Sequence, residues 1–273
     1  MTKTEAALES GVNQHCGYVA FLDVLGFRAI VGSQNSEEKL ANYTDTVDNA
    51  IQLAGPCVLQ YVIFSDSVVV NSNRDDDESF ESILAACATL FAKFLQSGIA
   101  MRGAIAHGQF LRSSKPNGAF VAGRPIVEAY DYENRQNWVG IMLSPSTIAR
   151  QPDLEQKCKL PDGQEIKLGF DLKRLRLPSL IWRNRGIPFH KDDESSLAEP
   201  DSFDGYALLP TGNGVTHANI IQKLDDAIRS LERLKMVAPD PKAQQKYRSA
   251  IEWLRSNVRE CWAPTVLYAT ERV

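Results

Sequence analysis

Two aspartates in the first quarter of the chain stand where a strongly apolar segment gives way to a turn. Asp23 ends one apolar run and precedes Gly26 by three residues, while Asp66 lies between two further apolar runs. A carboxylate in such a place is costly unless something pairs with it. Two of them together could hold hard divalent cations, while the backbone amides of residues 25–28 cup a polyphosphate at the start of the next helix.

The elements that must position these aspartates alternate between β-rich runs and amphipathic helical patterns. Strands are predicted at 18–22, 58–64, 68–70 and 99–106, and helices within 36–54 and 80–95. This order, β-α-β-β-α-β, is that of the ferredoxin-like fold, an α+β sandwich. It places the end of the first strand beside the turn between the second and third. Either aspartate alone could serve only to form a turn or cap a helix, but this strand order favours a shared site.

The rest of the chain extends this unit. A helix at 123–133 and a strand at 138–143 suggest that the sheet continues, and the acidic segment 191–204 is predicted to be a mobile loop. Two capped helices, beginning at Thr216 and Asp240, are predicted to form an antiparallel hairpin packed on the sheet. We therefore divide the chain into an N-terminal tail (1–16), a catalytic domain (17–178) and a C-terminal extension (179–273).

Composition narrows the function classes. The formal net charge is −4, so there is no global basic field of the kind that binds nucleic acid or anionic membranes, and neither partner is predicted. No apolar run approaches the ~18 residues of a spanning helix and the start lacks a signal-peptide core, which predicts a cytoplasmic protein. The five cysteines are scattered without a CxxC pair. We interpret them as reduced packing residues, not disulfide partners or zinc ligands.

Three motifs resemble the successive motifs of class III adenylate and guanylate cyclases. They are Phe21-x-Asp23-x-x-Gly26-Phe27, Ser65-Asp66, and the segment 102–108 from Arg102 to Gly108, within a resemblance that covers about residues 17–143. The resemblance implies two Mn²⁺ or Mg²⁺ ions bound by Asp23 and Asp66 with help from the Val24 carbonyl, and an Arg102 that contacts the triphosphate. His107 is interpreted as a packing residue and not a catalytic base. The implied site comprises Asp23, Asp66 and Arg102 as catalytic residues, Asp23, Val24 and Asp66 as metal ligands, and Phe21, Leu25, Gly26, Phe27, Arg28, Val62 and Phe120 as substrate-binding residues.

The positions that read the base depart from the purine cyclases. Where those enzymes carry a lysine or glutamate and an aspartate or cysteine, this chain has Val62 and Phe120. Apolar side chains cannot form the hydrogen bonds that select adenine or guanine, which disfavours a purine substrate. The family's transition-state asparagine and arginine align with Val127 and Asp131, and Arg124 or Arg135 could supply the missing positive charge.

A preserved metal site with altered base and helix residues resembles the pyrimidine cyclases of Pycsar anti-phage defence. This implies conversion of UTP to 3′,5′-cyclic UMP, a second messenger for a separate effector. In such a cyclase the 3′ hydroxyl attacks the α-phosphate in line with departing pyrophosphate, assisted by two metal ions. Class III sites form between two catalytic domains, which implies a homodimer. The alternatives are a cytidylate cyclase acting on CTP, a purine cyclase, or an inactive nucleotide-binding module; a diguanylate-cyclase palm is a minor one, because its Gly-Gly-Asp/Glu-Glu-Phe hairpin is missing.

Overall fold

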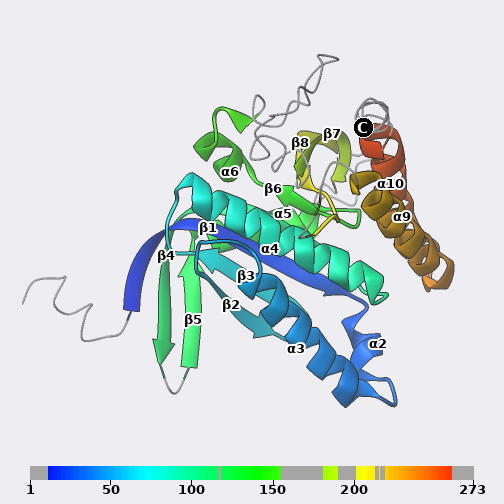
Figure 1. The fold of residues 1–273 in the computed structure, drawn as a ribbon, viewed down its shortest axis with the longest axis horizontal. Helices are drawn as coiled ribbons and strands as arrows, with labels where there is room; N and C mark the ends of the chain where they lie inside the picture. The colour runs from blue at the N-terminus through cyan, green and yellow to red at the C-terminus, as the bar shows by residue number, and fades with distance from the viewer. Residues whose placement is uncertain are drawn as a thin grey trace, which may run out of the picture.

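One mixed sheet forms the centre of the computed structural model, which describes residues 12–115, 118–154, 181–189, 201–212, 215 and 219–259 (Figure 1). Its strands follow the order β2-β3-β1-β4-β6-β8-β7, and β5 pairs with β4 outside this path. The strands are β1 (Val12–Leu25), β2 (Leu59–Phe64), β3 (Ser67–Ser72), β4 (Ala100–Lys115), β5 (Gly118–Gly123), β6 (Ile141–Leu143), β7 (Ile181–Phe189) and β8 (Asp201–Leu208). The helices are α2 (Phe27–Val31), α3 (Ser36–Gln52), α4 (Asp77–Gln96), α5 (Arg124–Arg135), α6 (Pro145–Arg150), α9 (Ile220–Val237), α10 (Pro241–Glu252) and the π-helical η1 (Trp253–Arg259).

The predicted ferredoxin-like order is confirmed. The strand β1 lies between β3 and β4 and is antiparallel to both, while β2 pairs with the outer edge of β3. The helices α3 and α4 make the two crossovers of this unit. The register sets Asp23 opposite Ser67 on one side and opposite Arg102 on the other. The end of β1 and the β2–β3 turn therefore meet in the middle of the sheet.

Alternation along β1 separates the two faces of the sheet, because successive side chains of a strand point to opposite sides. Leu22 and Val24 are buried in the main core with α3 and α4, and α4 crosses in front of the strands in Figure 1. Phe21 and Asp23 point to the other face, which α5 covers. There Ala104, Ala106 and Ala129 form a small separate cluster with Phe21 packed against it, and these short side chains let α5 approach the sheet closely.

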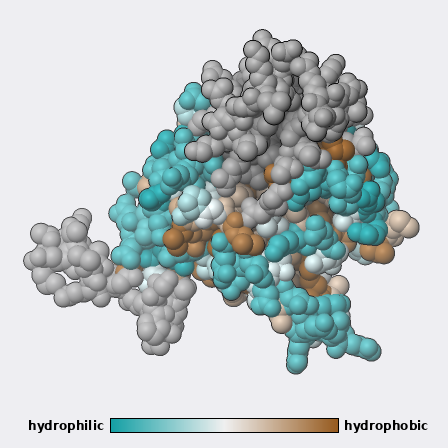
Figure 2. Space-filling model, viewed as in Figure 1, coloured by the Kyte–Doolittle hydropathy of each residue, from teal (hydrophilic) through white to brown (hydrophobic). Residues whose placement is uncertain are grey.

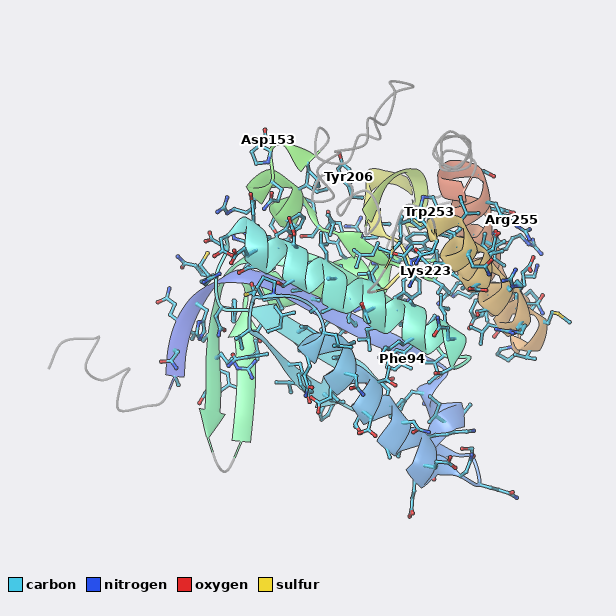
Figure 3. All side chains as sticks on the ribbon, viewed as in Figure 1. Phe94, Asp153, Tyr206, Lys223, Trp253 and Arg255 are labelled. Atoms are coloured by element: carbon cyan, nitrogen blue, oxygen red, sulfur yellow. The ribbon has the colours of Figure 1, made fainter. Side chains whose placement is uncertain are left out.

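The C-terminal part of the chain belongs to the same sheet. The strand β8 pairs with β6 and also with β7, so residues 201–204, predicted as loop, are strand; residues 191–200 lie outside the described part. The predicted hairpin of α9 and α10 is observed, but α9 packs against α4 rather than directly on the sheet, and the following η1 contacts β7 (Figure 1). Figure 3 labels Lys223 of α9 and Trp253 of η1, which both contact residues outside the hairpin. Lys223 donates to the Thr211 carbonyl over 2.8 Å, and Trp253 contacts Trp138 edge to face.

Some boundaries differ from the sequence prediction. The strand β1 begins at Val12, inside the predicted tail, because residues 12–16 pair with β4 out to Ser113 although their own pattern is polar. The hairpin between β4 and β5 was also not predicted. The face drawn in Figure 2 is mostly hydrophilic, with hydrophobic residues gathered in limited areas. Among the described helices, none combines the length and the apolar character needed to cross a bilayer.

Candidate active site

The structure places Asp23 and Asp66 beside one another at the end of the central strands. The backbone N–H of Val24 donates to the carbonyl of Asp66 over 2.9 Å. Burial of the Asp23 carboxyl raises its pKa; the positive charge of Arg102 opposes this and the negative charge of Asp66 adds to it. The two carboxyl groups are therefore close enough to repel one another, as expected of acids that share a cation.

Tight turns hold both aspartates. Asp66 shares the two-residue β2–β3 turn with Ser65, whose φ of 56° is in the left-handed region that such turns require. Past Asp23, Gly26 has a φ of 80° and begins the short helix α2. The glycine is suited to this place because left-handed backbone is costly for a residue with a Cβ atom. Backbone strain of this kind is typical of functional sites.

The residues around Gly26 divide between core and surface. Leu25 and Phe27 pack against the main core, and the Phe27 ring lies 5.6 Å from that of Tyr43. The Arg28 side chain is exposed. Of the predicted phosphate-binding segment, the backbone and Arg28 are therefore the parts available to a ligand, whereas the side chains of Leu25 and Phe27 stabilise the fold.

Arg102 is held by acidic and backbone groups of its own chain. Its Nε lies 3.6 Å from Oδ2 of Asp23 and forms an ion pair with Oε1 of Glu133, while Nη1 donates to the Gln136 carbonyl over 3.3 Å. The Arg102 side chain is only 17% exposed. Because Arg102 is largely buried and already paired with two carboxyl groups, this geometry favours a role in holding Asp23 over the direct phosphate contact that the sequence suggested.

Glu133 is a site residue that the sequence analysis missed. Its side chain is 2% exposed, and burial raises its pKa to about 7 against the opposing effect of Arg102. A signal was present, because Pro125, Ala129 and Glu133 follow one another at four-residue spacing on the buried side of α5. An acid on the buried stripe of a helix needs a partner inside the protein.

Lys246 brings the C-terminal hairpin into the same electrostatic cluster. This lysine of α10 interacts with Arg102, Glu133 and Asp23, and burial is the main cause of its lowered pKa. The interaction shows that α10 lies near the acidic end of β1. The C-terminal extension therefore contributes charge to the candidate site.

The residues predicted to form the base pocket do not all lie together in one chain. Phe21 packs edge to face on Tyr130 with ring centroids 5.3 Å apart, and Val62 lies in the same row of the sheet, paired with Val69. Phe120, the third of these residues, lies apart from Phe21 and Val62 within one chain. It lies on β5 opposite Ser113, about 36 Å along β4 from Arg102 at ~3.3 Å per residue.

The positions aligned with the transition-state pair lie on the outer side of α5. Val127 is 58% exposed and Asp131 is also exposed. Arg124 begins α5 and lines a hollow beside His107, remote from Arg102 along β4. The exposure of Val127 and Asp131 leaves both side chains accessible to a second chain.

Comparisons with known proteins give remote likenesses. No family model matches the chain, and no curated protein matches it. The catalytic core of a rhodopsin-guanylyl cyclase with converted specificity, in complex with ATPalphaS, has a TM-score of 0.47 at 11% identity over 72% of this chain and 97% of that one. A dimeric guanylyl cyclase domain from the aquatic fungus Blastocladiella emersonii has a TM-score of 0.42 at 14% identity, covering 52% of this chain and 86% of that one.

A class III adenylyl cyclase-like ATP-binding protein from Pseudomonas aeruginosa has a TM-score of 0.39 at 11% identity, covering 51% of this chain and 35% of that one. All three TM-scores are below 0.5. These likenesses therefore establish neither a family nor a function, and the function is inferred from the motifs and the geometry of the site.

Proposed function

We propose that this chain is a nucleotidyl cyclase of the class III type that converts UTP to 3′,5′-cyclic UMP and pyrophosphate. The observation that carries the proposal is the meeting of Asp23 and Asp66 at the ends of adjacent central strands, opposite Arg102. The resemblance of the three motifs to class III cyclases supports the same activity. The resemblance to pyrimidine cyclases supports a role in anti-phage defence, with a separate effector that responds to the cyclic nucleotide.

The donor set fits a pair of divalent cations. The Asp23 and Asp66 carboxylates and the Val24 carbonyl are all oxygen ligands, which Mg²⁺ and Mn²⁺ prefer. The mutual repulsion that helps to raise the Asp23 pKa is the kind that a bound cation relieves. Such ions, when bound, would neutralise charge on the leaving pyrophosphate and lower the pKa of the 3′ hydroxyl.

The chain's own residues supply position and charge. The backbone at Gly26 and the start of α2 present N–H groups beside Asp23, where phosphate oxygens can accept hydrogen bonds. Arg102 of the neighbouring strand β4, itself paired with Glu133 of α5, helps to orient Asp23. Such positioning provides much of the acceleration in phosphoryl transfer, because the reaction needs little covalent help from the protein.

The apolar residues near Asp23 support two further parts of the proposal, an apolar base pocket and a homodimer. Phe21, Val69 and Val62 form an apolar row two residues along the strands from Asp23. On the same face Phe64 is 80% exposed, and Val127 and Tyr130 of α5 are also exposed. Exposed apolar groups of this kind favour association, and a homodimer would bring Val127 and Phe120 of one chain toward Asp23 of the other.

A four-nucleotide panel tests the activity and the base preference together. The chain is incubated with ATP, GTP, CTP or UTP and Mn²⁺, and the products are identified by mass. Cyclic UMP as the main product supports the proposal. Cyclic CMP or a cyclic purine nucleotide as the main product would leave the cyclase assignment standing and overturn the base assignment, whereas tight nucleotide binding without pyrophosphate release would indicate an inactive binding module.

A further inference from the structure

A second group of metal-ligand side chains lies on the opposite face of the sheet from Asp23. Cys16 of β1, Asp75 of the loop before α4 and His107 of β4 place one sulfur, one oxygen and one nitrogen within 4.8 Å of one another. His107 is five residues along β4 from Arg102, which is about 16 Å at ~3.3 Å per residue. This cluster is therefore separate from the candidate active site.

We propose that Cys16, Asp75 and His107 form a binding site for a borderline-soft divalent cation of the Zn²⁺ type. The three donor atoms form a triangle, and the same atom of each residue takes part in both of its distances. Cys16 Sγ lies 3.9 Å from His107 Nε2 and 4.0 Å from Asp75 Oδ2, and the latter two atoms are 3.7 Å apart. Tetrahedral zinc with ordinary bond lengths needs edges of about 3.3 to 3.6 Å, so closure requires movements of a few tenths of an ångström.

Two of these donors lie on the paired strands β1 and β4, and the third lies on the loop before α4. Cys16 pairs with Gln109 and Tyr18 pairs with His107, so the thiol and the imidazole are diagonal neighbours on one face of β1 and β4. The His107 ring packs on the Tyr18 ring at 5.1 Å. Two of the three ligands are therefore fixed by strand register and ring packing, which lowers the ordering cost of binding.

The donor chemistry favours zinc over magnesium. A thiolate and an imidazole are ligands of Zn²⁺, whereas Mg²⁺ takes oxygen. The thiolate and the Asp75 carboxylate together would balance the two charges of the ion. Metal binding takes the neutral imidazole of a histidine and displaces the proton of a cysteine thiol, so the affinity of such a site should rise with pH.

A hollow lies beside one of the three proposed ligands, His107, whereas Cys16 and Asp75 do not line it. His107 lines a hollow of about 710 Å³ together with Arg124, Glu128 and Arg150. Three protein ligands with an open fourth position are the pattern of zinc sites that bind water or a substrate group. Arg150 approaches the same Asp75 oxygen, with Nε 3.2 Å away, and therefore orients the carboxylate but also competes for it.

Metal titration of the tag-free full chain tests the site. Zn²⁺ is added in competition with a coloured chelator, in excess Mg²⁺ to occupy oxygen-only sites. One Zn²⁺ per chain is expected, and Cys16→Ser should weaken binding at least 10- to 100-fold, the loss that changing even an outer partner of a zinc ligand causes. The matched control is Cys57→Ser, because Cys57 contacts Ser79 and lies outside the cluster.

Two further measurements separate ligation from folding effects. Co²⁺ should give a thiolate-to-metal charge-transfer band in the wild type and Cys57→Ser but not in Cys16→Ser. Zn²⁺ should raise the melting temperature of the wild type and not that of Cys16→Ser or His107→Gln, since only a ligand of the folded state stabilises it. Equal Zn²⁺ affinity in the wild type and Cys16→Ser, or no binding at a stoichiometric Zn²⁺ concentration, would overturn the proposal.

Discussion

Arg102 is shared between two acids, with its Nε 3.6 Å from Oδ2 of Asp23 and paired with the buried Glu133. One carboxylate belongs to the candidate metal site and the other to the inner side of α5. The arginine thus couples the orientation of Asp23 to the packing of α5 on the sheet. This coupling makes Arg102 and Glu133 open to test by stability as well as by activity.

Removing Arg102 should destabilise the fold through the acid that it leaves behind. Arg102→Ala leaves Glu133 as an unpaired buried carboxyl, a change that costs at most about 3 to 5 kcal/mol where the carboxyl is charged and less at pH values where it takes up a proton. Adding Glu133→Gln should recover part of that loss, because the stranded charge is then absent. Denaturant unfolding of the two single variants and the double variant measures the coupling. Strictly additive losses would show that the pair does not interact.

Glu133 should make the protein less stable as the pH rises. Burial raises its pKa in the folded state from 4.5 to about 7, so between these values the folded state holds a proton that the unfolded state has released. The contribution of Glu133 to the free energy of unfolding is therefore greatest below pH 4.5 and is lost as the pH rises through about 7. This contribution of Glu133 is at most about 3 kcal/mol.

Glu133→Gln should flatten this pH dependence, with Asp23 leaving a smaller one of the same sign. Unfolding free energies at pH 5 and pH 8 provide the measurement. Glu252→Gln is the matched control, because that side chain is exposed at the end of α10. If both variants keep the wild-type difference in unfolding free energy between pH 5 and pH 8, Glu133 is not the group responsible for it.

Asp66→Ala should abolish product formation while the fold stays intact. Asp66 is a turn residue that contributes little to core packing, so the expected change in unfolding free energy is below about 1 kcal/mol. Asp45→Ala on the exposed side of α3 provides the control and should keep wild-type turnover. Near-wild-type turnover in Asp66→Ala would refute the site assignment.

Gly26 and Gly98 allow a comparison of strain with function. Both have left-handed φ angles, 80° and 74°, and a Cβ atom would meet nothing within 4 Å at either. Alanine should therefore cost about 1 to 2 kcal/mol of stability at each position. Only Gly26→Ala should also raise KM for the nucleotide, because that turn presents backbone N–H groups beside Asp23. Equal kinetic effects in the two variants would remove the turn from the site.

The sequence by itself determined the ferredoxin-like order and the location of the two turn aspartates. Both follow from local patterns: apolar runs ending at Asp23 and around Asp66, and helical spacing in α4, α9 and α10. These patterns depend only on residues a few positions apart, so they can be recognised in a single amino-acid sequence.

Only the tertiary structure decided the partners of the charged groups. The ion pair between Arg102 and Glu133 and the cluster of Cys16, Asp75 and His107 join residues 31 to 91 positions apart. Their meeting depends on strand register and on the face of α5 turned to the sheet, and local polarity does not specify either. The polar start of β1 was missed for the same physical reason, since its hydrogen bonds are completed by β4 and not by its own neighbours.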